Sequence, residues 1–199
     1  MKKIFIILVV ICFCSLGSVT AQQSITTTSY SVGIPTGNLG EYISSASFRG
    51  ISFDYRKLIQ PNIGIGFYTA WNVFYQEKPY DTYEIGNQSL SGKQFRYTNS
   101  FPIMFATDYY MKPGEDFNPF IGGAIGGVYT ERATDMGIYR LEQDGFSLGF
   151  TPQIGFIYKV STFSAISISA KYNIALAAGD LENSQNFLSI NLGYTFMGN

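Results

Sequence analysis

The side chains that could do chemistry in this chain are few and of limited kinds. There is no histidine, so histidine general bases, serine–histidine triads and imidazole metal ligands are unavailable. The two cysteines, Cys12 and Cys14, lie in an N-terminal segment with the features of a removable leader. We therefore expect no thiolate nucleophile, disulfide or zinc–cysteine site in the remaining chain. We expect no enzyme activity, metal or cofactor.

The leader prediction rests on the order of residue types at the start of the chain. Lys2 and Lys3 precede an apolar run at 4–13, which is followed by small residues up to Ala21. This order is typical of a secretory signal peptide, and the run is too short to span a membrane as a helix. We expect cleavage after Ala21, with a single domain at 22–199. Without the two leader lysines, 11 of the 13 basic residues and all 14 acidic residues remain, so a nucleic-acid partner is not expected.

The remaining chain shows alternation of apolar with small or polar residues, the period of a strand with two different faces. The third segment is the clearest, because large residues from Ile63 to Val73 alternate with smaller ones such as Gly64 and Ala70. Eight segments share the pattern: 26–34, 48–57, 62–74, 95–109, 118–130, 145–159, 163–175 and 187–196.

The connections between these segments are alternately long and short. The short ones are 59–61, 110–117 and 160–162, and the long ones are 35–47, 75–94, 131–144 and 176–186. The pattern predicts an all-β fold, an eight-stranded antiparallel up-and-down transmembrane β-barrel, with long extracellular loops and both termini in the periplasm.

Side-chain size indicates which face of these strands points outward. The lumen of an eight-stranded barrel has room only for the face rich in Gly, Ala, Ser and Thr, so the face of large apolar residues is expected to point outward. Within the eight segments this outward face is expected to carry no charged residue, because a charge facing lipid is costly. A soluble ligand-binding barrel is the alternative to a membrane barrel. Ten aromatic residues are expected to form two girdles at the membrane interfaces: Tyr55, Trp71, Tyr109, Tyr129, Phe146, Phe156, Tyr158, Tyr172, Tyr194 and Phe196.

Five charged residues fall on the face expected to line the lumen: Asp54, Arg56, Arg96, Asp108 and Lys171. An unpaired charge in a narrow barrel loses several kcal/mol of solvation, so these residues need partners. Strand direction places Arg56, Asp54 and Asp108 in the periplasmic half, and Arg96 and Lys171 nearer the long loops. We predict an ion-pair network joining Arg56 to Asp108 or Asp54. It is interpreted as a structural plug, with a gate for a small pore as the alternative.

Two further patterns have a structural and a functional interpretation. The glycine-rich run 122–127 resembles a phosphate-binding loop, but it has no following Lys-Ser/Thr and is better explained as a strand whose glycines make room in the lumen. Acidic residues in the long segments are expected to be solvated, with divalent cations bridging to lipopolysaccharide as the alternative. They are Glu77, Asp81, Glu84, Asp135, Glu142, Asp144, Asp180 and Glu182.

Three stretches, Asn118–Ala124, Pro152–Phe156 and Asn191–Phe196, resemble strands of the outer-membrane β-barrel domain family, the OmpA/OmpW-like small barrels. The resemblance extends over nearly all of 22–199. It implies export, insertion by the barrel-assembly machinery, contact with outer-membrane lipid and lipopolysaccharide, and a location in the outer membrane of a Gram-negative bacterium. Phe196 is followed by three residues, whereas the insertion signal of such proteins usually ends on an aromatic residue.

The resemblance leaves three functions open. The leading expectation is a monomeric outer-membrane protein with a structural or surface-interaction role, whose specificity would lie in segments 35–47, 75–94, 131–144 and 176–186. The second is a narrow channel or conduit for small solutes, with hydrophobic molecules among the candidates. The third is a soluble periplasmic ligand-binding barrel.

Overall fold

The computed structural model describes residues 23–85 and 88–198, and the expected signal peptide lies outside these ranges. Eight strands follow one another along the chain: β1 (Ser24–Thr36), β2 (Ser47–Gln60), β3 (Ile63–Ile85), β4 (Gln88–Tyr110), β5 (Phe117–Met136), β6 (Tyr139–Lys159), β7 (Ser164–Ala175) and β8 (Gln185–Gly198). A short helix, α2 (Gly37–Tyr42), connects β1 and β2. In the described part of the chain no helix has the length and apolar character needed to cross a membrane.

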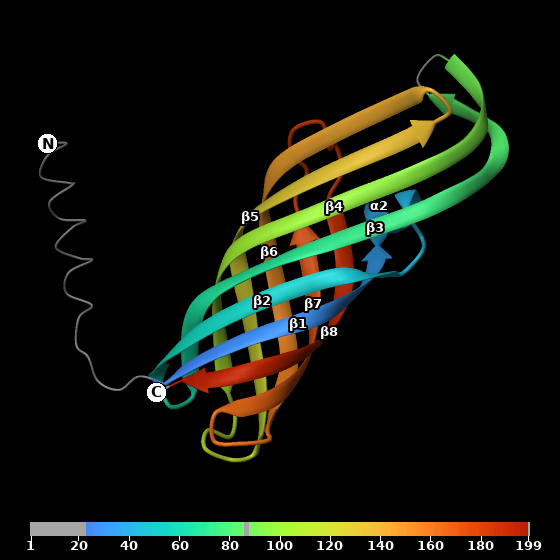
Figure 1. The fold of residues 1–199 in the computed structure, drawn as a ribbon. Coiled ribbons are helices and arrows are strands. Elements are labelled where there is room, and N and C mark those ends of the chain that lie inside the picture. Colours follow the sequence, from blue (N-terminus) through green and yellow to red (C-terminus); the bar gives the residue numbers. More distant parts are fainter. Residues whose placement is uncertain (1–22, 86–87, 199) are drawn as a thin grey trace, which may run out of the picture.

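Each strand pairs antiparallel with the next, and β1 closes the barrel against β8 (Figure 1). The closing register runs from Ser24↔Gly198 to Thr36↔Asn186, so the start of β1 and the end of β8 lie at the same end of the barrel. Closure gives the strands no free edge, which is the condition for a sheet to be stable in lipid. The fold class predicted from the alternation is confirmed.

Two of the expected long loops are wrong, because segments 75–94 and 131–144 are mostly paired strand. The β3–β4 hairpin is paired as far as Ile85↔Gln88, and the β5–β6 hairpin as far as Met136↔Tyr139. Figure 1 shows these four strands extending well beyond the rest of the barrel. Charged side chains fall on both faces of the β3 extension, as Glu77 and Lys78 do, so the extensions lack the apolar alternation by which a strand would be recognised. Pro79, which cannot donate to a ladder, falls within the register shift between Lys78 and Asp81.

The other two long connections differ in where they pack. The connection between β7 and β8 is bound to β6, since the Asp180 N–H donates to the Asp144 carbonyl at 3.0 Å, whereas the connection between β1 and β2 folds into the mouth of the barrel. Gly37, with a φ of 54°, turns the chain out of β1 into α2, a conformation that glycine adopts without strain. Leu39 of α2 and the following Ile43 pack on Phe74 and Phe187 inside the mouth. Six residues are too few for a helix to be stable alone, so this packing holds α2 in place.

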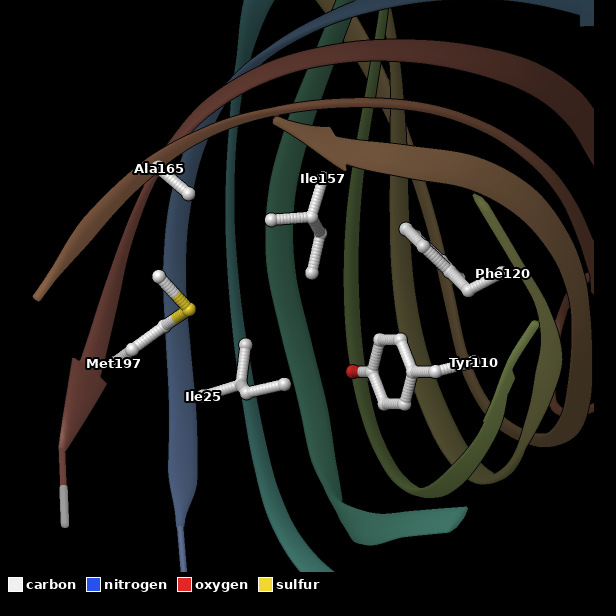
Figure 2. Close-up of a cluster of buried hydrophobic side chains, with 6 residues drawn as sticks. All are labelled: Ile25, Tyr110, Phe120, Ile157, Ala165 and Met197. Atoms are coloured by element: carbon white, nitrogen blue, oxygen red, sulfur yellow. The ribbon is translucent and has the colours of Figure 1, made fainter. Parts of the chain in front are cut away.

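The lumen is filled by more than the small residues expected there. Three apolar clusters occupy it, one at the end with the short turns, one in the middle around Tyr68 and Met104, and one at the mouth around Phe74 and Phe187. Figure 2 shows the cluster at the turn end, where side chains from several strands point toward one another: Ile25, Tyr110, Phe120, Ile157, Ala165 and Met197. These larger residues point inward because a barrel of this size must fill its interior.

The outward face is formed by large apolar side chains around the whole barrel. Phe105 is 78% exposed, Ile103 70% and Phe146 70%. The expectation that this face has no charge is wrong at the two ends of β2, where Arg49 and Lys57 are exposed and alternate with the buried Ser52 and Arg56. We call the uncharged apolar surface that runs around the barrel, and that includes Ile103, Phe105 and Phe146, the outer belt.

Candidate functional site

Four of the five predicted lumen charges meet in one network. The Arg56 guanidinium binds Asp108 through Nε and Oδ2, 2.7 Å apart, and Asp54 through NH2 and Oδ1, 3.1 Å apart. Lys171 Nζ lies 2.6 Å from the other Asp54 oxygen. Two cations and two carboxylates therefore compensate one another, which is the condition for charges to be tolerated at this depth. We call these four residues the lumen network.

Arg56 is the centre of the lumen network. It is only 2% exposed, and its NH1 group also donates to the carbonyl oxygens of Tyr55 at 3.0 Å and Phe67 at 2.8 Å. The guanidinium thus contacts the β2 and β3 backbones as well as two carboxylates. Its planar set of donors suits such a position, which a lysine could not fill.

Lys171 was expected nearer the long loops, but its ammonium group reaches down to Asp54. The ammonium lies 3.9 Å from the centre of the Tyr68 ring, a cation–π contact. Tyr68 in turn donates to Asn173 Oδ1 at 3.3 Å. Strand direction gives the height of a Cα atom, and the long lysine side chain moves its charge several ångströms from there.

Gln153 belongs with the network, although it was not predicted from the sequence. Its Nε2 donates to the Asp108 oxygen that Arg56 leaves free. The register pairs Gln153 with Lys171, so the charged residues are linked across β2, β4, β6 and β7. Such a neutral polar residue could have been found by locating which inward positions share a level with Asp108.

The glycine-rich strand makes room for this arrangement. Gly122 faces the lumen opposite Asp108, and a Cβ atom there would overlap the Asp108 carboxylate. The segment is strand β5, as predicted. Gly123 and Gly127 alternate with Gly122 and Gly126 and lie on the other face, where a Cβ atom on Gly127 would meet the exposed Phe146 ring.

Arg96 lies apart from the lumen network, at the mouth. Its NH1 group donates to the Tyr42 carbonyl at 2.8 Å and its Nε to Gln94 Oε1 at 2.7 Å. The Tyr42 ring is contacted by Arg96, 4.8 Å from the ring centre, and by Arg132, 4.0 Å away. We call these three residues the mouth cluster. Arg132 and Tyr42 are not among the predicted site residues, because both lie in segments predicted to be loops.

The Tyr42 hydroxyl fixes α2 to β5. It donates to the Ala133 carbonyl at 3.0 Å and lies 2.5 Å from Thr134 Oγ1. Burial raises the pKa of the Tyr42 hydroxyl above its usual value, while the bond to Thr134 and the two arginines act in the opposite direction. Tyr42 is therefore neutral at physiological pH, and the mouth is closed by packing and hydrogen bonds.

The free space around the lumen network is small. A cavity of about 20 Å³ lies between the network and the inward serines and threonines of β1 and β7. This volume accommodates roughly one water molecule. The apolar cluster at the turn end and the two clusters toward the mouth lie within the same lumen.

Three acidic residues of the hairpins are paired with basic side chains. Glu77 pairs with Lys93 at 2.6 Å, and Arg140 binds Glu142 at 2.5 Å and Asp135 at 3.5 Å. Within 23–85 and 88–198, no cluster of three or more acidic residues is arranged to hold a metal ion.

All ten residues predicted for the aromatic girdles lie on the outward face. Most are well exposed, including Trp71 at 50% and Tyr194 at 61%. An aromatic row crosses β3, β4 and β5, in which the Phe101 ring centre lies 5.6 Å from that of Trp71 and 6.4 Å from that of Tyr129. Their contact with membrane interfaces stays a prediction.

Comparison with known proteins identifies the fold. No protein-family model and no curated protein matches the chain. Among solved structures, Ail, the attachment invasion locus protein of Yersinia pestis, has a TM-score of 0.57 at 10% identity, with 89% of this chain and 99% of Ail covered. OprG, an outer membrane protein of Pseudomonas aeruginosa, has a TM-score of 0.55 at 13% identity, with 89% and 96% covered. Neisserial surface protein A has a TM-score of 0.51 at 13% identity, with 90% and 97% covered. The chain therefore has the fold of the small eight-stranded outer-membrane barrels. Ail has also been crystallised with the heparin analogue sucrose octasulfate.

Proposed function

We propose that this protein is a non-catalytic outer-membrane barrel with a closed lumen, which presents the β3–β4 and β5–β6 hairpins at the cell surface. The outer belt is the observation that carries this proposal. Large apolar side chains are exposed on every strand, among them Phe105 at 78% and Tyr194 at 61%. A continuous apolar surface of this extent is not stable in water and suits lipid. The soluble periplasmic barrel is therefore disfavoured.

The proposed orientation places the short turns in the periplasm and the long hairpins outside, as in other barrels of this class. Export by a signal peptide ending at Ala21 and insertion by the barrel-assembly machinery belong to the same proposal. Arg49 would then lie on the outward face near the outer leaflet, with its guanidinium 5.8 Å from the centre of the Tyr75 ring. A cation held there is suited to a lipopolysaccharide phosphate.

The filled lumen favours a structural role over a channel. Three apolar clusters and the lumen network occupy successive levels of the interior, and the cavity at the network holds about one water molecule. A conducting barrel needs a continuous aqueous path, as in larger porins. The lumen network then acts as a plug that fixes the strands relative to one another.

The end of the barrel that carries the long hairpins has more acidic than basic residues among those with described side chains. Nine acidic residues with described side chains occupy the hairpins, α2 and the last long loop: Glu41, Glu77, Asp81, Glu131, Asp135, Glu142, Asp144, Asp180 and Glu182. Only six basic residues accompany them: Arg49, Lys78, Lys93, Arg96, Arg132 and Arg140. We propose that a surface partner would be basic rather than a sulfated polyanion of the kind crystallised with Ail.

Fractionation and conductance test this proposal together. The protein expressed with its own N-terminal segment should be recovered in the outer membrane, and its gel mobility should change on heating, as a folded barrel unfolds. The purified barrel should give no single-channel steps in a planar bilayer. Recovery in the soluble periplasm would overturn the membrane assignment, and reproducible conductance would replace the structural role with the channel.

A further inference from the structure

The outer belt is interrupted by an apolar groove on one side of the barrel. The groove has a volume of about 1090 Å³ and is lined by residues of β2 to β6. Ile65, Phe67, Phe105, Ile125 and Phe150 supply most of its large side chains. A groove of this depth would not form if every outward residue of these strands were large.

Small outward residues form the floor of the groove. Thr107 pairs with Gly123, and Gly123 pairs with Pro152, so the three lie side by side on β4, β5 and β6. The same row continues through Ile65 to Lys57 on β2. Four strand spacings give the row a length of about 19 Å, which is comparable with the ~15 Å of hydrocarbon in one leaflet.

The row rises from the turn end toward the middle of the outer belt. Lys57 is three residues from the end of β2 at Gln60, whereas Pro152 is seven residues from the end of β6 at Lys159. At about 3.3 Å per residue, Pro152 lies about 13 Å farther from its strand end than Lys57 does. One end of the groove therefore lies near the membrane surface and the other deeper in the hydrocarbon.

Lys57 places a positive charge at the shallow end. Its side chain is exposed, and among residues with described side chains no carboxylate lies within 4.0 Å of Nζ. A lysine at this level extends its ammonium group to the interface, where lipid phosphates lie. The groove thus has a cationic end and an apolar body, the complement of a phospholipid.

We propose that the groove binds one anionic phospholipid of the leaflet on the turn side, with its headgroup at Lys57 and an acyl chain over Thr107, Gly123 and Pro152. This inference rests on the proposed membrane location and adds a defined lipid site to it. A second copy of the chain would also bury apolar surface there, but it would bring a second Lys57 without supplying an anion for the first.

Quenching of tryptophan fluorescence by brominated lipids measures this binding in the intact barrel. Trp71 is the only tryptophan, so Trp71→Phe gives a silent background. Phe105→Trp then places a reporter in the groove, and Leu192→Trp places a matched reporter on β8, outside it. Vesicles contain phosphatidylcholine with increasing brominated phosphatidylglycerol or brominated phosphatidylcholine.

Quenching of the groove reporter should show a preference of about fivefold for brominated phosphatidylglycerol over brominated phosphatidylcholine, which is the effect of one lysine near an anionic lipid surface. Quenching of the β8 reporter should show no preference. Lys57→Gln should reduce the preference to about one. Gly123→Leu should reduce it as well by filling the floor, because a Cβ atom there meets nothing closer than 3.7 Å and the barrel is not strained. Ala170→Leu, at another small outward position, should leave it unchanged.

Three results would overturn the lipid site. The first is quenching of the groove reporter that shows no preference between the two lipids. The second is a preference that remains in Gly123→Leu. The third is quenching that decreases as the protein-to-lipid ratio rises, to the same extent for both headgroups. The second result would mean that Lys57 attracts headgroups without the groove, and the third that a second copy covers it. Heat-dependent gel mobility of each sample separates these outcomes from failure of the membrane assignment, since a barrel that does not insert shows no folded band.

Discussion

Arg56 on β2 reaches across β3 to Asp108 on β4, with Nε and Oδ2 2.7 Å apart inside the lumen. The contact is possible because the intervening strand presents glycines at this level. Gly66 pairs with Arg56, and Gly64 pairs with Asp108. The ion pair therefore joins two strands that share no backbone hydrogen bonds, and it fixes the shape of the barrel as well as compensating two charges.

Removing Arg56 should destabilise the barrel strongly. Arg56→Met leaves Asp108 without a cation and Asp54 with Lys171 alone, and breaking a buried pair from one side typically costs about 3–5 kcal/mol. Urea unfolding in lipid vesicles, followed by gel mobility, measures the change in free energy. The double variant Arg56→Met/Asp108→Asn should lose less than the sum of the two single variants. Strictly additive losses would mean that the two side chains do not interact.

Gly122→Ala and Gly123→Ala form a matched pair on β5. The added methyl group at Gly122 would overlap the Asp108 carboxylate, whereas at Gly123 it would meet only ordinary contacts of 3.7 and 3.9 Å. We expect Gly122→Ala to reduce the free energy of unfolding by about 1–3 kcal/mol, as overpacking does, and Gly123→Ala to change it little. Equal effects in the same urea assay would contradict the placement of Gly122 against the network.

The closure of the mouth should depend on the ionisation of Tyr42. Because the pKa of Tyr42 is raised in the folded protein, the neutral hydroxyl contributes stability that is fully present below the ordinary tyrosine value near 10. That stability is lost as the pH rises through the higher folded-state value. Amide hydrogen exchange of α2, corrected for the intrinsic effect of pH, should therefore increase above about pH 10.

Tyr42→Phe provides the control for this pH effect. The variant keeps the ring between Arg96 and Arg132 but loses the hydrogen bonds to Ala133 and Thr134. Exchange of α2 should be faster than in the wild type by a constant factor and should not show the alkaline increase. An alkaline increase of the same size in both proteins would assign the transition to another group.

A gate and a plug make different predictions for Arg56→Ala. If Arg56 closed an otherwise open pore, its removal would raise the current in planar bilayers. We expect no current in either protein, because the apolar clusters at the turn end and the mouth remain in place. Current steps that appear only in folded Arg56→Ala would favour the gate.

The sequence predicted the barrel because its alternation reports a difference between two environments. A strand could be recognised wherever one of its faces forms part of the outer belt and the other lines the lumen, as in the segment from Ile63 to Val73. The alternation disappears where both faces carry polar side chains, as at Glu77 and Lys78, so the sequence predicts loops for the outer halves of the β3–β4 and β5–β6 hairpins. Arg49 and Lys57 were overlooked for a related reason, since each lies at the end of an otherwise apolar face.

The lumen network could be predicted in part. Inward charges in one half of a narrow barrel must compensate one another, which led from Arg56 to Asp108 and Asp54. Lys171 was placed at the wrong level because the length of its side chain carries the ammonium group away from its Cα atom. The contacts of Arg96 with Tyr42 could not be predicted, because they depend on α2 folding back over the mouth, and no pattern in 35–47 indicates that direction.

Site-directed labelling tests most directly whether the outer belt faces lipid around a closed lumen. Residues 23–198 contain no cysteine, so single cysteines can be introduced without a background. In vesicles, Phe105→Cys should react with a lipid-soluble maleimide but not with a charged, water-soluble one, and Ser167→Cys, facing the lumen beside the network, should react with neither. A cysteine on the β5–β6 hairpin at Ile138 should react with both. Rapid reaction of Phe105→Cys with the charged reagent in the folded barrel would contradict the account.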